Sequence, residues 1–322
     1  MTRQSIVYIV AGVCLLTAAT LGAQTQVPPS QPAAAAQDPA AELLKQGQQK
    51  LRDGKHDEAL ATYRAAIEKA SPSTPTAVTA YVQAGVVLDL MGKYADARSQ
   101  FTKAIENASA IEDKSRALRA MAMSYAFERN CDGVARYESQ AYQAFLAAND
   151  FFNAGEVANE LARACLESDS LDQAATWYRR GRDAGMKEPG MKPERKDLWE
   201  FRWEHAQARL AARRGQKAEA EKHVAAAKAV LDKGTNPEQA SFFPYLVGYV
   251  AFYGGDNQAA VTELQKGNQN DPFIMCLMAQ AYEKLGDKDK ATEYYRKVLT
   301  SNGHSPTNAY ARPLAKEKLG VK

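Results

Sequence analysis

Residues 272 to 299 decide the fold, and they read PFIMCLMAQAYEKLGDKDKATEYYRKVL. In the first half, apolar and small residues recur three and four positions apart, which places their side chains on one face of a helix. These residues are Met275, Met278, Ala279 and Tyr282. Gly286 and Asp287 interrupt that face, and the same spacing returns in Ala291, Tyr295 and Val298. The stretch therefore predicts two short antiparallel helices joined by a turn.

The small and aromatic residues of this hairpin have complementary roles. A small residue such as Ala291 lets two helices approach closely, and an aromatic ring such as that of Tyr295 fills the space behind it. One hairpin cannot bury both of its faces. It therefore needs neighbours of the same kind.

The same hairpin recurs along the chain, most clearly at residues 81–104. This copy carries Tyr81, Ala84, Gly85 and Leu88, then Gly92 at the turn, then Ala97, Phe101 and Ala104. The small residue of each second helix marks seven copies, at Ala59, Ala97, Gly133, Ala174, Ala220, Ala260 and Ala291. The third copy fits one residue out of step, which predicts a shortened turn there.

With these residues the chain resembles a tetratricopeptide repeat protein of an exported bacterial type, whose unit of about 34 residues is a helix–turn–helix with this alternation. The resemblance implies an all-α fold over residues 41–322, a right-handed superhelical array of about seven antiparallel helix–turn–helix repeats. It also implies that the first helix of each repeat lines a concave groove. Function should then lie on those inward faces.

A last helix is predicted at residues 305–319. Ser305 is a helix-capping residue and Pro306 suits the first turn. Pro313 should bend or divide this helix. Its apolar residues would cover the open end of the stack, and they are Tyr310, Leu314 and Leu319.

The chain begins with the pattern of a secretory leader. Arg3 precedes an apolar run from Ser5 to Leu21, and cleavage after Ala23 would remove residues 1–23 as a signal peptide. We therefore expect export to the periplasm, the cell envelope or the medium. The alternative is an uncleaved leader that anchors the chain, which would be its contact with a membrane. Residues 24–40 are rich in Pro and Ala and predict a disordered linker.

The net charge argues against nucleic acid as a partner. Removing residues 1–23 takes Arg3 from the net charge of +3 and leaves +2, far from the basic excess of a general nucleic-acid binder.

Three cysteines would remain, so not all can pair. Cys131 and Cys165 lie near successive hairpin turns and could form a disulfide. We favour the simpler interpretation that both are small buried residues of a helical core.

The sequence carries no pattern typical of an enzyme. It lacks Gly-x-Ser-x-Gly, a phosphate-binding glycine loop and Cys-x-x-Cys. The four histidines are scattered, and none has a second histidine at ligand spacing. They are His56, His205, His223 and His304. We therefore expect no catalytic residues, no metal and no cofactor.

Some residues on the first helix of a repeat are not needed for packing between hairpins. In several repeats these residues form a stripe along the helix. The fifth repeat has a basic stripe with spacings of three, four and four, and the sixth has an aromatic stripe in the corresponding place. The basic stripe is Arg202, His205, Arg209 and Arg213, and the aromatic stripe is Phe242, Tyr245, Tyr249 and Phe252. The third and fourth repeats add Arg116, Arg119, Asn159 and Arg163.

These stripes predict a groove that binds a protein or peptide segment. Arginine can hold a carboxylate by two parallel hydrogen bonds, so the ligand would be acidic or carry a free carboxylate. Tyrosine would pack an apolar side chain. In the alternative interpretation the aromatic residues pack against Phe273 and the arginines pair with glutamates inside the superhelix. A different class of function is an architectural subunit that assembles through its outer helix faces.

Overall fold

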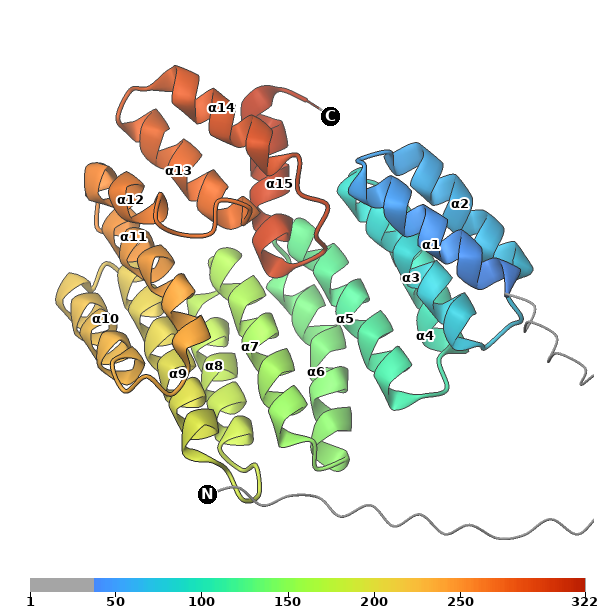
Figure 1. Ribbon diagram of the computed structural model, residues 1–322, viewed down its shortest axis with the longest axis horizontal. Coiled ribbons are helices and arrows are strands. Elements are labelled where there is room, and N and C mark those ends of the chain that lie inside the picture. Colours follow the sequence, from blue (N-terminus) through green and yellow to red (C-terminus); the bar gives the residue numbers. More distant parts are fainter. Residues whose placement is uncertain (1–37, 322) are drawn as a thin grey trace, which may run out of the picture. The chain divides into compact units, whose positions relative to one another are not determined.

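The computed structural model describes residues 38–321 and consists there of helices (Figure 1). The helices are α1 Pro39–Arg52, α2 His56–Lys69, α3 Pro75–Leu90, α4 Tyr94–Asn107, α5 Ile111–Phe127, α6 Cys131–Ala147, α7 Phe151–Glu167, α8 Leu171–Gly185, α9 Pro193–Arg213, α10 Lys217–Leu231, the 3₁₀ helix η1 Pro237–Phe242, α11 Phe243–Tyr253, α12 Asn257–Leu264, α13 Pro272–Lys284, α14 Lys288–Val298 and α15 Pro306–Leu319. The all-α repeat array predicted from the sequence is confirmed. The predicted leader, residues 1–23, lies outside the described residues, and α1 begins inside the segment predicted as linker.

Each of the seven hairpins turns over three residues, and the middle residue of every turn has a positive φ. Glycine holds this position in five repeats, as expected of a residue without a Cβ. In the third and fourth repeats the residues are Arg129 and Asp169, with φ of 54° and 62°. The predicted shortening of the third turn is therefore wrong. Both non-glycine side chains make long-range contacts, Arg129 with the ring of Tyr310 and Asp169 with Arg213.

The frame of the third repeat is shifted by one residue from the predicted one. In the other six repeats the small marker residue is the fourth residue of the second helix and is buried. The fourth residue of α6 is Val134, which is fully buried, so Val134 and not Gly133 occupies the marker position. Gly133 instead packs against the ring of Tyr125 in α5.

Four residues after the marker lies the position that an aromatic ring is expected to fill. The seven residues there are Tyr63, Phe101, Glu138, Tyr178, Val224, Leu264 and Tyr295. In the first repeat a Cβ on Gly47 would lie 2.5 Å from the ring of Tyr63, so the glycine is required for this close approach. The pairing of small and aromatic residues predicted from the sequence is confirmed here. Glu138, Val224 and Leu264 depart from it.

Glu138 is a carboxyl group in the place of a core ring. Its side chain is fully buried, and neither oxygen has a hydrogen-bond partner in the part of the chain that the structure describes. Burial, followed by the charge of Glu160, raises the pKa of Glu138 well above its usual range, and Arg119 opposes the shift. The neutral form of this side chain is therefore favoured in the folded protein relative to the unfolded chain.

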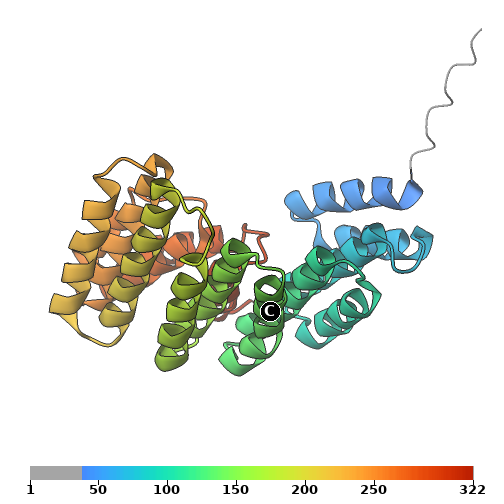
Figure 2. The same cartoon turned by 90° about the horizontal axis from the view of Figure 1, so that it is seen from below.

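The C-terminal segment packs on two parts of the array. Helix α15 contacts α13 and α14, which is the capping role predicted for it, and its remaining faces contact α5 and α7 (Figures 1 and 2). Ser305 caps the helix by accepting a hydrogen bond from the Asn308 N–H. Helix α15 continues through Pro313, so the predicted division does not occur.

Polar contacts tie this segment to the first two repeats. Arg312 Nε donates to the carbonyl of Leu90 at 2.9 Å, and Asn302 Nδ2 donates to the carbonyl of Leu51 at 2.8 Å. His304 Nε2 lies 2.8 Å from a carboxylate oxygen of Asp89, which is almost fully buried. The seventh repeat is therefore linked to repeats one and two by residues more than 200 positions apart in the sequence.

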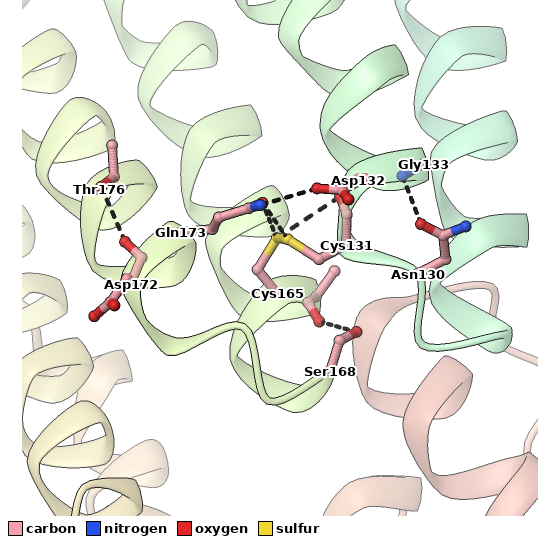
Figure 3. The surroundings of a disulfide bond; sticks show 10 residues. Asn130, Cys131, Asp132, Gly133, Cys165, Ser168, Asp172, Gln173 and Thr176 are labelled. Atoms are coloured by element: carbon pink, nitrogen blue, oxygen red, sulfur yellow. Dashed lines mark hydrogen bonds between the residues drawn. A yellow bond between two sulfur atoms is a disulfide. The ribbon is translucent and has the colours of Figure 1, made fainter.

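A disulfide joins Cys131 at the start of α6 to Cys165 near the end of α7, with Cα atoms 4.8 Å apart (Figure 3). The interpretation of both as free buried thiols is therefore wrong. The two turns face each other because successive repeats stack in register, which brings residues 34 positions apart into bridging distance. Cys276 is buried and forms no disulfide with the other cysteines of residues 38–321.

We predict that Glu138 makes stability depend on pH. The folded-state pKa is raised, so its contribution is fully present below the unfolded value of about 4.5 and is lost as pH rises toward the folded value. In this window the free energy of unfolding should fall by up to about 1.4 kcal/mol per pH unit, and Glu138→Gln should remove that slope.

Urea unfolding of the wild type and of Glu138→Gln at several pH values measures the effect. Glu106→Gln, at an exposed position of α4, is the control and should follow the wild type. Parallel pH profiles for the wild type and Glu138→Gln would show that the buried carboxyl does not titrate as described.

Candidate functional site

A cleft of about 550 Å³ opens between the fourth and sixth repeats. Helices α7, α8 and α9 supply one side, and η1, α11 and the start of α13 supply the other. Thr307 at the start of α15 also lines it, so the C-terminal segment contributes to the site. The lining residues are Glu156, Asn159, Arg163, Tyr178, Phe201, Arg202, His205, Arg209, Gln239, Ser241, Phe242, Tyr245, Asn268, Asp271, Ile274 and Thr307.

Seven of the twelve residues predicted from the sequence line this one cleft. They are Asn159, Arg163, Arg202, His205, Arg209, Phe242 and Tyr245. Helical spacing explains the agreement, because residues three and four apart on α7 and on α9 share the face turned toward the cleft. Whether they bind a peptide is a separate matter from their placement.

The other five predicted residues do not line this cleft, and they are Arg116, Arg119, Arg213, Tyr249 and Phe252. Arg116 bonds to Asp113 and Thr79, and Arg119 pairs with Glu160. Tyr249 and Phe252 are buried in the core, so they do not form part of an open wall. Helix α11 has apolar residues on all sides, so its sequence alone does not show which side faces α13.

Most of the arginines are already paired with acidic side chains. Arg202 pairs with Glu156 across α7 and α9, and Arg213 pairs with Asp169 and Glu167. The alternative interpretation of the sequence, that arginines pair with glutamates inside the array, is confirmed for these residues. Packing of aromatic rings against Phe273 is confirmed as well, for Tyr245 and Tyr249.

Arg163 is held by a buried network. Its Nη2 donates to Tyr245 Oη at 2.6 Å, its Nε lies 2.8 Å from a carboxylate oxygen of Glu167, and its guanidinium lies 4.5 Å from the ring centre of Phe273. Burial raises the pKa of Tyr245 to about 12, although Arg163 and Arg209 lower it in part, so the phenol stays protonated. Arg163 therefore positions Tyr245 on the cleft wall.

Glu167 is the centre of this network and was missed by sequence reasoning. It is almost fully buried at the end of α7 and lies between Arg163 and Arg213, 3.1 Å from Nη1 of the latter. The sequence offered a weak signal, since Glu167 follows Arg163 by four positions, the spacing of an ion pair on one helix. Its contact with Arg213 depends on how α7 and α9 stack.

Arg209 differs from the other two arginines of the cleft, Arg163 and Arg202, which are paired with glutamates. Only 6% of the residue is exposed, and none of the acidic side chains in residues 38–321 lies within ion-pair distance of it. Its Nε donates to the carbonyl of His205 at 3.3 Å, and its guanidinium lies 5.5 Å from the ring centre of Tyr178. Its Nη1 has no hydrogen-bond partner within the same residues. A buried cation of this kind is costly unless an anion accompanies it.

His205 lies beside Arg209 and is also incompletely satisfied. It is 8% exposed, its Nε2 has no hydrogen-bond partner, and its ring stacks on that of Tyr245 with centres 5.6 Å apart. Burial, and then the charges of Arg209 and Arg163, hold the pKa of His205 well below its usual range. The imidazole is therefore neutral, and a neutral imidazole can donate one hydrogen bond and accept another.

Two further observations concern the described part of the chain. No group of three or more His, Cys, Asp or Glu side chains there is arranged to hold a metal ion. Within residues 38–321, none of the helices has the length and apolarity that crossing a membrane requires.

Comparisons with known proteins agree on the repeat. Family profiles described as tetratricopeptide repeat match residues 39–110 and 274–304. Comparison with curated protein sequences gave no match.

Solved structures share the fold at low sequence identity. Aspartyl phosphate phosphatase F from Bacillus subtilis is 11% identical, with a TM-score of 0.57 over 80% of this chain and 69% of that one. The apo form of RapI is 13% identical, with a TM-score of 0.52 over 87% and 98% of the two chains. A tetratricopeptide repeat protein from Parabacteroides merdae is 15% identical, with a TM-score of 0.49 over 87% and 97%. At these identities the likeness is one of fold.

We predict that Glu167→Gln strongly destabilises the protein. The substitution keeps the shape of the side chain but leaves two buried guanidinium groups facing a neutral amide. Removing one partner of a buried ion pair costs about 3–5 kcal/mol in the free energy of unfolding. Urea unfolding measures this loss.

The matched control is Glu128→Gln, which removes the partner of Arg98 in a more exposed ion pair. Such pairs contribute at most about 1 kcal/mol. Equal losses in the two variants would contradict the central role of Glu167.

Proposed function

We propose that the protein, which carries tetratricopeptide repeats at residues 39–110 and 274–304, is a non-enzymatic scaffold that binds a segment of another protein in the cleft. The observation that carries the proposal is Arg209, a buried guanidinium without an acidic partner among the described residues. A carboxylate of the ligand would supply the missing anion. Repeat arrays of this kind serve mainly as interaction surfaces, and the fold by itself does not name the partner.

The chemistry around Arg209 suits a carboxylate. Charge-assisted hydrogen bonds to a guanidinium are among the stronger ones in proteins. Arg209 and His205 both line the cleft, and within residues 38–321 Nη1 of the first and Nε2 of the second have no hydrogen-bond partner. Both nitrogens are buried, so a carboxylate that accepts a hydrogen bond from either would have to displace the groups that cover it. The arginine is already buried, so binding adds an attraction without a further cost of removing that group from water.

An apolar side chain of the ligand would pack on the aromatic residues of the cleft. Phe242 is 51% exposed, unusual for a large apolar residue in this chain, and Tyr178 and Tyr245 line the cleft with it. Buried aromatic area of this kind supplies much of the binding energy in peptide recognition. The proposed ligand is thus a segment with a carboxylate and a neighbouring apolar side chain.

An enzymatic function receives no support from the polar groups. Ser124, Asp89 and His304 lie together, but Ser124 donates to Asp89 and not to the histidine, so no nucleophile is paired with a base. These residues serve the attachment of the C-terminal segment. The phosphatase activity named for the Bacillus subtilis neighbour is not transferred to this chain by a likeness in fold.

We place the protein outside the cytoplasm, in the periplasm or at the cell envelope. The leader pattern of residues 1–23 suggests export, and the disulfide between Cys131 and Cys165 suits an oxidising compartment. The linker that follows the leader would let the scaffold reach its partner near the membrane.

The test uses two small probes, N-acetyl-leucine, which has a carboxylate, and N-acetyl-leucinamide, which does not. We expect the wild type to bind the first and not the second in an NMR titration. Arg209→Met should weaken binding at least about 10-fold, since hydrogen bonds to charged groups contribute about 1.5–3 kcal/mol. Binding should also weaken with added salt.

Arg116→Met removes an exposed arginine outside the cleft and should bind N-acetyl-leucine as the wild type does. Equal binding of acid and amide, or full binding by Arg209→Met, would refute the proposed site. It would then favour the other function considered for this chain, assembly through the outer helix faces.

A further inference from the structure

A buried acid–base pair lies where the C-terminal segment meets the second repeat. Asp89, in the last turn of α3, is 1% exposed, and one of its carboxylate oxygens accepts a hydrogen bond from Ser124 Oγ at 2.8 Å. The other oxygen lies 2.8 Å from Nε2 of His304. The imidazole ring packs against the rings of Phe101 and Phe127, whose centres lie 5.7 and 5.6 Å from its own. The pair is therefore shielded from water.

The surroundings leave the buried carboxylate largely to the histidine. Within residues 38–321, His304 is the one basic side chain within ion-pair distance of Asp89. The charge of Arg98, on α4, acts on Asp89 from farther away, and Arg98 is itself paired with Glu128. Other titratable side chains at this junction are His56 of α2, Tyr94 of α4, and Arg312 and Lys316 of α15.

The number of protons on the pair decides what its burial costs. A neutral imidazole can donate to the carboxylate, but the pair then carries a negative charge, which is unfavourable away from water. One added proton, on either group, leaves the pair without net charge. Burial raises the pKa of Asp89, although the hydrogen bond and the charge of His304 lower it in part. The attached segment should therefore bind protons more tightly than a detached one.

This linkage has a definite sign. Because the pKa of Asp89 is raised, its contribution to stability is fully present below the ordinary value of 3.8 and is lost as pH rises through the value in the folded protein. A proton lost from either group restores the buried negative charge, and imidazoles change charge between about pH 5 and 8. Attachment of the segment should therefore weaken as the pH rises.

We propose that residues 300–319 form a pH-dependent latch, which fastens the seventh repeat to the second in mildly acidic solution and loosens as the pH rises. The latch concerns this attachment alone and does not depend on what the cleft binds. Its opening would break the hydrogen bond from Arg312 to the carbonyl of Leu90. It would also move Thr307, so the change would reach the edge of the cleft.

Hydrogen–deuterium exchange of the full chain at about pH 5.5 and 8, near the two ends of the histidine range, tests the latch. Protection factors are compared, because they remove the effect of pH on the intrinsic exchange rate. One linked proton changes an equilibrium constant by up to about tenfold per pH unit, so protection of residues 300–319 and 86–92 should fall at least about fivefold in the wild type. Asp89→Asn keeps the shape of the side chain without its charge, so its protection should fall less than about twofold.

Asp96→Asn removes an exposed acid of α4 and should keep the pH dependence of the wild type. Glu138→Gln, which removes the other buried carboxyl, should keep it in residues 300–319 as well. Circular dichroism checks the folding of each variant. Equal protection of residues 300–319 at both pH values in the wild type, or a pH dependence that Asp89→Asn retains in full, would overturn the proposal.

Discussion

One buried guanidinium, that of Arg312, connects the last helix to the second repeat. Its Nε donates to the carbonyl of Leu90, and its Nη1 donates to the carbonyls of Leu299 and Ser301, both at 3.0 Å. All three acceptors lie at or just beyond helix ends, where carbonyl groups lack partners within their own helix. Burial lowers the pKa of Arg312, and the carbonyls compensate for lost water without a neutralising carboxylate. Arg312 therefore satisfies groups that would otherwise be unpaired in both repeats.

This attachment decides which part of the repeat array is open. Helix α15 contacts α5 and α7, and its Tyr310 lies beside Ala126 and Ala164, near the ends of these two helices. The cleft around Arg209 lies beyond that contact, with Thr307 of α15 at its edge. The two non-glycine turn residues also take part in these contacts. Arg129 contacts Tyr310 of α15, and Asp169 pairs with Arg213, which also pairs with Glu167. Side chains at strained backbone positions are retained when they make contacts of this kind.

Local patterns predicted the repeats well, and the errors have identifiable causes. Helical spacing and the turn glycines give the hairpins, and Ser305 gives the start of the last helix. The predicted frame of the third repeat is wrong by one residue because Gly133 is small and precedes the true marker, Val134. In addition, Glu138 stands at the position where an aromatic residue is expected. The contacts of α15 with the second repeat could not be predicted, because they join residues more than 200 positions apart in the sequence. The disulfide depends in the same way on how successive hairpins stack.

At the candidate site, the sequence predicted which side chains lie on the same face of a helix. It did not predict which residues those side chains contact. Seven predicted residues line one cleft because α7 and α9 keep their periodicity. The partners of the arginines come from neighbouring repeats, so only the structure distinguishes the paired Arg163 and Arg202 from Arg209.

Hydrogen–deuterium exchange of the full chain tests the attachment of α15 most directly. In the wild type, residues 300–319 should be protected, and Arg312→Ala should speed exchange both there and in residues 86–92 at the end of α3. Arg296→Ala, at an exposed position of α14, should change neither. Residues 300–319 that exchange freely in the wild type, or an Arg312→Ala variant that leaves residues 86–92 unaffected, would contradict the attachment of the C-terminal segment on which this account depends.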